Sequence, residues 1–401
     1  MTISYVSITS HDPLISRDGR PFGKGQGNRM RSLEWIYPSM LAGSIRTMLG
    51  KMMGGSFTPG EVETLKRLSI SGPFPLVNGL LYIPAPKDIL VKNENGNRSS
   101  VALRPMSLRE GEGCDLPKGL RPAMHKGEEE FKPEKVPAFW SMTKMTDWLM
   151  DSEGMSFGPP ATGEDLNDVL DFMNSPEKEE RIHVEIDSET GTSKEGQLFS
   201  TTGLDLTRNR PIRGEPLQFA ARIESDGTLD GHIKDLDTLH PLGGERRLAH
   251  WKSQKMVETW AFPSNMTNCF EGALGKRLRL ILATPALFSG GWLPGWLDMV
   301  GDSIAGRPPG APEDLTLKLV SACVDHWRPI SGWSVERGKR GPKPVRRLVP
   351  AGSVYFFEVL SGNAEELVRR LWLKPLSDDE QDRRDGFGLA LWGVWNAPKN
   401  E

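Results

Sequence analysis

Apolar and polar residues alternate most regularly in the middle of the chain, over residues 181–201. Ile182, Val184 and Ile186 occupy every second position, with polar residues between them, and this is the period of a strand with one apolar and one polar face. A shorter strand is predicted over 198–201, after a polar loop that contains glycine. The pattern therefore predicts a projecting β-hairpin, of which one face can be buried while the other meets solvent or a ligand.

The loop of this hairpin has the chemistry of a phosphate or sugar contact. Thr190, Gly191 and Thr192 supply hydroxyl groups, backbone amides and the conformational freedom of glycine, and such groups commonly contact a nucleic-acid backbone. His183 lies on the polar face of the first strand. An ordinary surface hairpin would explain the same residues, so both interpretations stay open.

The N-terminal part of the chain is predicted as strand, helix, strand and strand. Residues 3–10 alternate as in a strand, and the segment PSMLAGSIRTMLGKMM forms an amphipathic helix with Ser39 as the expected N-cap. Asn78-Gly79 stands between two short apolar segments and is a strong hairpin signal.

Residues 87–180 break this pattern with proline-rich and charged connections, so they are interpreted as an insertion. Two helices are expected in it, at 141–150 and 162–175. After the hairpin, a strand at 216–224 and a short helix near 233–239 precede the segment LGGERRLAHW. The first domain is predicted to end near residue 262.

The remainder of the chain repeats the order of elements. The predicted elements are a strand at 277–284, a short helix at 293–300, strands at 315–324 and 354–360, a helix capped by Asn363 and a last strand at 386–395. The coarse order is therefore β-α-β-β-α-β twice, which is the split βαβ order of ferredoxin-like domains. The predicted fold class is α+β, with two ferredoxin-like (RRM-type) domains at 1–262 and 263–401, a hairpin thumb at 181–201 and the insertion at 87–180 in the first.

Composition and charge limit the functional classes. The 401 residues carry a formal charge of -3 and a pI near 6.2, which argues against a wholly basic nucleic-acid binder. The segment 337–347 nevertheless carries six basic residues and no acidic one, so local basic surfaces are expected. No apolar run approaches the roughly 20 residues of a membrane span, and no signal sequence is recognisable at the N-terminus. We expect a cytoplasmic protein.

Motifs of catalysis and cofactor binding are missing from the sequence. The three cysteines are far apart, and no GxGxxG, GK[ST], HExxH or GxSxG pattern occurs. We therefore expect no metal, no cofactor and no catalytic residue. The alternative is a metal-independent endoribonuclease in which His183 or His11 acts as the general acid or base.

Two further segments are candidates for RNA contact. In RGKRGPKPVRR the cations Arg337, Lys339 and Arg340 can follow a phosphate backbone, and Trp327 and Trp333 precede them where they can stack on bases. A solvated loop without function and tryptophans of the core are the alternatives. In the C-terminal segment GFGLALWGVW, Gly386 and Gly388 either let an RNA backbone approach closely or form a tight turn before a buried strand.

Five segments, taken in order, resemble the RAMP proteins of CRISPR effector complexes, most closely the third subunit of the Cmr (type III-B) complex. They are HDPLISRDGRPFG, PSMLAGSIRT, HVEIDSETGTSKEGQLF, LGGERRLAHW and GFGLALWG. They span nearly the whole chain, which makes a chance resemblance improbable.

The resemblance implies a non-catalytic RNA-binding subunit that holds the 5′ tag of the CRISPR RNA, with the hairpin as a thumb against the guide, and caps one end of the complex. The implied neighbours are the large polymerase-like subunit and the first backbone RAMP subunit, and target RNA is contacted indirectly. A protein-protein adaptor in which the basic loop is idle is a further hypothesis. The implied RNA-binding residues are Arg17, Arg20, Arg46, His183, Thr190, Gly191, Thr192, Arg246, Arg247, Gly386 and Gly388. To these the charge of the basic segment adds Arg337, Lys339 and Arg340.

Overall fold

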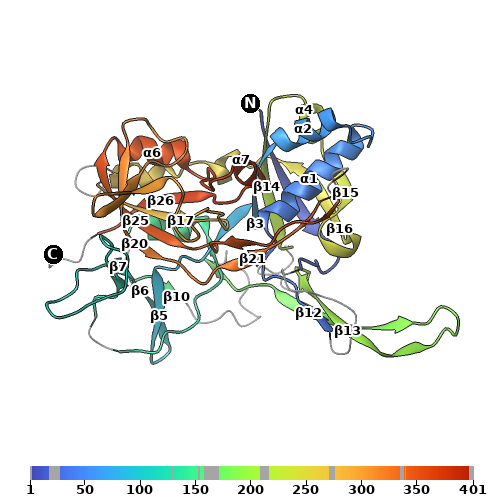
Figure 1. Ribbon diagram of the computed structural model, residues 1–401, viewed down its shortest axis with the longest axis horizontal. Helices are drawn as coiled ribbons and strands as arrows, with labels where there is room; N and C mark the ends of the chain where they lie inside the picture. Colours follow the sequence, from blue (N-terminus) through green and yellow to red (C-terminus); the bar gives the residue numbers. More distant parts are fainter. Residues whose placement is uncertain are drawn as a thin grey trace. The chain divides into compact units, whose positions relative to one another are not determined.

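The chain forms two compact units, each assembled from three separate segments (Figure 1). The computed structural model describes residues 2–17, 28–127, 130–151, 154–157, 171–207, 216–270, 276–334, 338 and 340–396. Unit 1 comprises Met1–Asn78, Ser175–Lys255 and Arg328–Arg347, and unit 2 comprises Gly79–Asn174, Met256–Trp327 and Leu348–Glu401.

This division differs from the two consecutive domains predicted from the sequence. The predicted insertion belongs to unit 2 as far as residue 174, and the basic segment 328–347 belongs to unit 1. Compactness is set by long-range pairing of strands, and such pairing does not follow the order of segments along the chain. In the described part of the chain, none of the helices has the length and apolar character needed to cross a membrane.

Unit 1 is built on five antiparallel strands in the order β3-β14-β1-β16-β15. Helix α1 packs against β3 and β15 and lies beside α2 and α4 (Figure 1). The predicted apolar face of α1 is fully buried at Leu41, Ile45 and Leu49. The bounds are β1 Thr2–Ser10, α1 Pro38–Met52, α2 Pro59–Arg67, β3 Ser69–Val77, β14 Gln218–Ser225, α4 Asp230–Ile233, β15 Asp237–Pro241, a 3-10 helix Gly244–Arg246 and β16 Leu248–Gln254.

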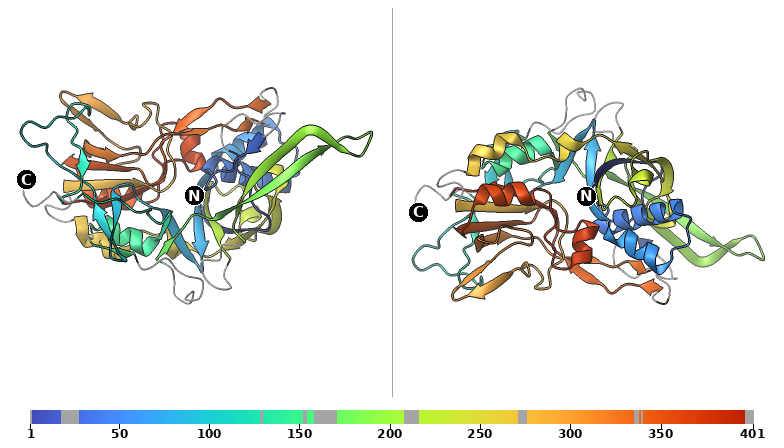
Figure 2. Two further views of the ribbon diagram at one scale, coloured as in Figure 1. Left: turned by 90° about the horizontal axis from the view of Figure 1, so that it is seen from below. Right: turned by 90° about the horizontal axis from the view of Figure 1, so that it is seen from above.

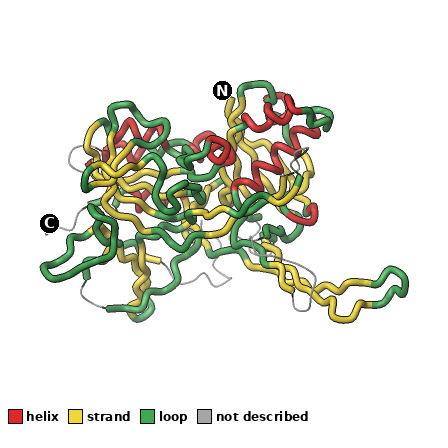
Figure 3. The backbone as a smooth tube through the Cα atoms, viewed as in Figure 1, coloured by secondary structure: helices red, strands yellow, loops and turns green. Residues whose placement is uncertain are grey.

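The predicted hairpin is present and is longer than expected. Strand β12, Glu177–Ile186, pairs antiparallel with β13, Ser193–Asp205, and β2, Asn28–Met30, runs parallel to β13 at the base. Both views in Figure 2 show that the hairpin extends away from the rest of unit 1, and Figure 3 shows its loop at the far end. The prediction of a projecting finger is confirmed.

Unit 1 is completed by the segment that follows residue 327. It folds into short strands, of which β22 pairs with β23 and β21 pairs with β24. Their bounds are β21 Arg328–Ile330, β22 Trp333–Ser334, β23 Gly341–Pro342 and β24 Arg346–Leu348. Within the described part of the basic segment, residues 341–342 and 346–347 therefore lie in paired strands.

Unit 2 contains a six-stranded antiparallel sheet in the order β18-β19-β20-β25-β17-β26. Asn363 caps α6 as predicted, because its side-chain oxygen accepts the N–H of Glu366 at 3.2 Å. The bounds are β17 Arg277–Leu282, β18 Leu297–Val300, β19 Ser303–Gly306, β20 Thr316–Cys323, β25 Val354–Ser361, α6 Ala364–Leu371, α7 Glu380–Asp385 and β26 Ala390–Val394.

The former insertion supplies the smaller sheets of unit 2. These sheets are β10-β6-β5 and β7-β8, and two further strands of the insertion, β11 and β9, extend a larger sheet in the order β11-β9-β4. Helix α3 begins after Ser141, whose side chain caps it. The bounds are β4 Leu80–Pro84, β5 Ile89–Glu94, β6 Asn97–Ala102, β7 Arg104–Pro105, β8 Ala123–Met124, β9 Phe139–Ser141, α3 Met142–Leu149, β10 Ser156–Phe157, β11 Phe172–Met173, α5 Val257–Trp260 and a 3-10 helix Ser264–Phe270. The predicted helix at 141–150 is thereby confirmed.

Three predicted helices differ from the structure. The segment 293–300 ends in strand β18, because the Asp378 carboxylate accepts the N–H of Gly295 at 2.9 Å and holds the preceding residues in a loop. The segment 233–239 divides between the end of α4 and the start of β15. Of the segment 162–175, residues 162–170 lie outside the described residues, and 172–173 form β11.

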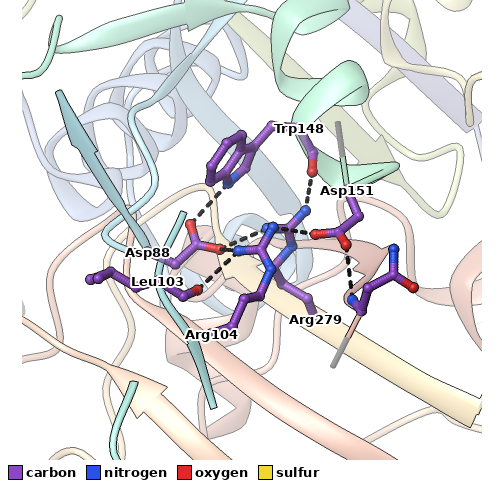
Figure 4. Close-up of polar contacts among 7 residues, drawn as sticks. Asp88, Leu103, Arg104, Trp148, Asp151 and Arg279 are labelled. Atoms are coloured by element: carbon purple, nitrogen blue, oxygen red, sulfur yellow. Dashed lines mark hydrogen bonds and ion pairs between the residues drawn. The ribbon is translucent and has the colours of Figure 1, made fainter. Parts of the chain in front are cut away.

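A buried ionic cluster joins the first segment of unit 2 to its large sheet (Figure 4). Asp88 accepts hydrogen bonds from Arg279 Nη1 at 2.7 Å and from Trp148 Nε1 at 2.9 Å. Arg104 lies 3.5 Å from Asp88 and donates to Asp151. The Asp88 and Arg279 side chains are 0% exposed, so each charge depends on its partners.

We expect Asp88→Asn to lower the free energy of unfolding by about 3–5 kcal/mol, because the change leaves the buried Arg279 guanidinium without its counter-charge. Urea unfolding of the full chain measures the loss. The control is Asp302→Asn, which breaks an exposed pair with Lys118 whose side chains are 73% and 74% exposed, and which should cost under about 1 kcal/mol. Equal losses in the two variants would contradict this role of the cluster.

Candidate nucleic-acid interface

A cavity of about 830 Å³ in unit 1 runs along helix α1. We call it the α1 groove. Four separate parts of unit 1 line it: the loop after β1, the start and one side of α1, the segment between β15 and β16, and the hairpin β22–β23. The lining residues are Ser16, Arg17, Leu33, Tyr37, Ser39, Met40, Gly43, Ser44, Thr47, Lys51, His240, Pro241, Gly243, Arg246, Ser331, Gly332, Trp333 and Lys343.

Helix α1 forms the floor of the groove with a stripe of mostly small residues. From Met40 through Gly43 and Thr47 to Lys51, the lining positions recur at helical spacing and cover about 16 Å of helix length. A Cβ atom added at Gly43 would meet no other atom within 4 Å. The floor is therefore open and long enough for an extended ligand.

The positive end of α1 faces this groove without a side-chain cap. The sequence predicts Ser39 as the N-cap, but the helix begins at Pro38 and its N-cap is Tyr37, which makes no side-chain capping bond. No acidic residue lies in the first turn. Because the helix dipole favours anions at a helix N-terminus, this end of α1 suits a phosphate group.

The second wall depends on two glycines of the LGGERR segment. Gly243 has a φ of 82°, and a Cβ atom there would lie 2.7 Å from the carbonyl oxygen of Ile15. The next residue, Gly244, donates its N–H to the same oxygen at 2.7 Å. A side chain at 243 would push the two segments apart, so the glycine brings Arg246 close to the loop that carries Arg17.

The two adjacent arginines of this segment have different roles. Arg247 donates to the Glu245 carboxylate at 2.9 Å, and its side chain is only 18% exposed. Arg246 is exposed and lines the groove. Its φ of 54° and the φ of 55° at Glu245 are left-handed, which is a strained conformation for residues with side chains. The strained turn directs Arg246 toward the groove.

The fourth part of the lining is the base of the β22–β23 hairpin. The N–H of Lys343 donates to the carbonyl of Gly332 at 2.8 Å, and the Ser331 hydroxyl donates to the carbonyl of Lys343 at 2.8 Å. These bonds hold the residues before β22 against the residue after β23, so the side chains of Trp333 and Lys343 extend from backbone segments that are fixed relative to each other.

The lining contains four cationic residues and no acidic one. They are Arg17, Lys51, Arg246 and Lys343. Among the described residues, the side chains of Lys51, Arg246 and Lys343 form no ion pair. Burial lowers the pKa of the His240 imidazole, and the nearby Lys51 ammonium lowers it further, so His240 is uncharged at neutral pH. The groove therefore presents positive charge from its arginines and lysines.

The chain matches the family model of the CRISPR-associated protein Cas_Cmr3 over residues 6–395. The chain belongs to the Cas_Cmr3 family. The resemblance recognised from its motifs is therefore confirmed.

Two solved structures are similar to this Cas_Cmr3 family member. One is a type III-B Cmr-β complex bound to cognate target RNA and AMPPnP, in which a chain is 16% identical with a TM-score of 0.45, over 88% of this chain and 86% of that chain. The other is the Csm3–Csm4 subcomplex of the type III-A interference complex, with 10% identity and a TM-score of 0.39, over 89% and 94% of the two chains. None of the curated proteins matches the chain.

Of the arginines predicted from the family motifs, Arg17 and Arg246 meet in the α1 groove. Arg46 does not, because its guanidinium donates to the carbonyls of Leu65 and Leu68 at 3.0 and 3.1 Å and thereby satisfies the C-terminus of α2. Arg340 is exposed but does not line the groove. Arg20, Arg337 and Lys339 lie outside the described residues.

The predicted residues of the hairpin lie on a separate surface of unit 1. His183 stacks on Phe199, with ring centroids 5.1 Å apart, and shares a hydrogen bond of 2.8 Å with the Thr201 hydroxyl. At the loop, the hydroxyls of Thr190 and Thr192 bond to each other at 2.8 Å, and Gly191 has a φ of 69°. The loop is exposed and closed by its own hydrogen bonds.

The apolar face of this hairpin is exposed. The alternating pattern of the sequence left one face available for burial, yet Ile182, Val184 and Ile186 are 72%, 42% and 56% exposed, and Leu198 on the paired strand is 55% exposed. Among the described residues of unit 1, the hairpin is paired near its base, where β2 runs beside β13 and Leu14 forms a bridge with Leu204. Four neighbouring apolar side chains on a projecting arm form a patch of the kind used for binding.

The structure assigns Gly386 and Gly388 to the fold of unit 2. Both are buried and have a positive φ, of 94° and 79°. A Cβ atom at Gly388 would lie 2.9 Å from the backbone nitrogen of Ser377. Of the two interpretations of this motif, the tight turn before a buried strand describes the structure, and close approach of an RNA backbone does not.

The sequence indicated Trp333 as a stacking residue, but it did not indicate Lys51 or Lys343 as individual contacts, nor that these three residues line one groove. The stripe of small residues on α1 was a usable signal, since it marks a helix face that does not enter the core. The closure of the groove by residues 331–343 depends on long-range folding and has no local signal. Among the described residues, no group of three or more potential metal ligands occurs.

We expect Gly243→Ala to destabilise unit 1 by about 2–3 kcal/mol, because it adds a contact with Ile15 to the cost of a left-handed φ. The matched control is Gly55→Ala, at a φ of 75° with open space around the Cβ position, which should cost about 1 kcal/mol. Urea unfolding measures both variants. A loss no greater at 243 than at 55 would show that the close contact is not required.

Proposed function

We propose that this Cas_Cmr3 family member is an RNA-binding subunit of a type III-B CRISPR effector complex, and that it holds the 5′ tag of the CRISPR RNA in the α1 groove. The proposal rests on a groove lining that contains four cations and no acidic residue, and two of these cations, Arg17 and Arg246, lie in the family motifs. Hydroxyl groups of Ser16, Ser39 and Thr47 lie among these cations. Cations, hydroxyls and a helix N-terminus together are the groups that bind a ribose-phosphate backbone.

The length of the groove favours a strand over a single anion. About 16 Å of α1 separates Met40 from Lys51, with cations at both ends, since Arg17 and Arg246 come from the segments near the start of the helix and Lys51 lies in its last turn. A few nucleotides of a single strand fit this length.

The topology of the two units supports two ferredoxin-like domains. In unit 1, β1, α1, β3, β14, α4 and β16 follow the βαββαβ order, and the first strand lies between the third and the fourth in the sheet. In unit 2, β17, β20, β25 and β26 have the same spatial order, with α6 before the last strand. The first helix of that domain is replaced by β18 and β19. Such folds commonly bind RNA.

The hairpin β12–β13 is the second proposed contact with the guide. Its exposed apolar face and its stacked pair His183 and Phe199 offer surfaces for bases, and its loop offers the hydroxyls of Thr190 and Thr192. In this role the hairpin positions RNA as a thumb. His183 acts there as a contact and not as a catalyst.

The proposed partners follow from the family and from the charge distribution. The subunit caps one end of the complex, beside the large polymerase-like subunit and the first backbone RAMP subunit, and meets target RNA only through the guide. A net charge of -3 combined with a strongly cationic groove suits a subunit that binds RNA at one place and proteins elsewhere.

Charge reversal at Arg246 should weaken guide binding and the assembly of the complex on the guide. For Arg246→Ala, the salt dependence of RNA affinity should also become shallower by about 0.7 in log Kd against log salt, which corresponds to one lost contact with a single-stranded backbone. Fluorescence anisotropy with a labelled RNA carrying the 5′ tag measures both effects.

The control is Arg370→Glu, at an exposed position of α6 in unit 2, which should leave affinity and salt slope unchanged. Wild-type affinity and assembly in Arg246→Glu would refute the assignment of the groove. Equal losses in Arg246→Glu and Arg370→Glu would show a general charge effect.

A non-catalytic subunit should leave RNA intact. Purified protein incubated with repeat RNA in EDTA should give no discrete cleavage products on a denaturing gel, and His183→Ala and His11→Ala should behave as the wild type. Cleavage at a defined position that disappears in His183→Ala would instead establish the metal-independent endoribonuclease.

A further inference from the structure

Trp333 is the most exposed tryptophan of the described residues, at 61%. The sequence contains twelve tryptophans, and besides Trp333 only Trp327 is exposed, at 52%. Within the described part of the chain, the indole of Trp333 makes no hydrogen bond, ring contact or cation contact. A large aromatic side chain that is exposed to solvent and contacts no other side chain of the protein is typical of a ligand-binding position.

The backbone around Trp333 is well fixed although its side chain is exposed. Trp333 stands opposite Pro342 in the pairing of β22 with β23, and the bonds from Lys343 to Gly332 and from Ser331 to Lys343 flank this pair. The indole is thus presented from a short pair of hydrogen-bonded strands. Little conformational entropy is lost when such a group stacks on a ligand.

The surroundings of Trp333 select the class of ligand. Trp333 and Lys343 line the same groove as Arg17 and Arg246, and no acidic residue lines it. An apolar protein segment would gain nothing from these cations, whereas a nucleotide has both an aromatic face and a phosphate. Stacking on an aromatic side chain next to a cationic track is the usual way of binding single-stranded RNA.

We propose that Trp333 stacks on one unpaired base of the guide RNA bound in the α1 groove, with Lys343 at the adjacent phosphate. This inference rests on the proposed function of the groove and adds a base-binding position to it. Stacking tolerates any base, because every base has a π face, so the position fixes the register of the strand and does not read its sequence.

The first test compares the affinity and salt dependence of variants of the full-length chain for a labelled single-stranded RNA that carries the 5′ tag. Trp333→Ala should weaken binding by about 5-fold or more and leave the slope of log Kd against log salt unchanged, since stacking releases no counterions. Trp333→Phe should recover most of the affinity. The control Trp327→Ala, a similarly exposed tryptophan that does not line the groove, should bind as the wild type.

The second test locates the base. RNAs with one abasic nucleotide at successive positions should identify a single position whose loss weakens binding to the wild type and has no further effect on Trp333→Ala. A double-mutant cycle of this kind reports a direct contact.

The outcomes separate the two proposals. If Arg246→Glu weakens RNA binding and Trp333→Ala does not, the groove binds RNA but the stacking position is refuted. If neither substitution changes the affinity, the groove itself is refuted as the RNA site. If Trp333→Ala leaves RNA affinity intact but disrupts assembly with the protein subunits, Trp333 contacts a protein and the stacking proposal fails.

Discussion

The α1 groove depends on one close contact, between Gly243 and the carbonyl of Ile15. The loop after β1 and the segment before β16 can meet at this distance only because residue 243 has no side chain and adopts a left-handed φ. The hydrogen bond from Gly244 to the same carbonyl then holds the two segments together. With this contact in place, Arg17 and Arg246, which are more than two hundred residues apart in sequence, line one cavity. The contact is therefore a condition for the concentration of charge in the groove.

Unit 2 depends on a constraint of the opposite kind. In unit 1 the constraint is the absence of a side chain at residue 243. In unit 2 it is the burial of four charged side chains, which must form ion pairs with one another. Asp88, Arg104 and Asp151 come from the first segment of unit 2, and Arg279 comes from strand β17. Removing any one of the four charges leaves the buried cluster with an uncompensated net charge in a medium of low polarity. This dependence explains how a long segment with little regular structure can be an integral part of the unit.

Local structure was predicted well from the sequence where the spacing of apolar residues and the chemistry of turns and caps determine it. The apolar stripe of α1, the cap at Asn363 and the alternation in β12 were each visible in a few residues. Prediction failed where distant partners determine the outcome, as at 293–300, where the Asp378 carboxylate holds the preceding loop. The same reason applies to the site. Arg17 and Arg246 were recognisable from motifs, but their meeting with Lys343 depends on the return of residues 328–347 to unit 1, and the internal role of Arg46 depends on the carbonyls that terminate α2.

The strained turn at Glu245 and Arg246 gives a physical reason to regard Arg246 as functional. Two consecutive residues with side chains hold left-handed φ values, each at a cost on the order of 1–3 kcal/mol. A glycine at either position would relieve this cost without disturbing the contact at Gly243. Arg247 is satisfied by the Glu245 carboxylate, and this pairing leaves its neighbour as the residue that faces the groove. Fold stability alone gives no reason to keep in such a conformation an exposed arginine that has no ion pair among the described residues. The phosphate of the proposed ligand supplies a reason, because it compensates the strain only when the guanidinium is held in place.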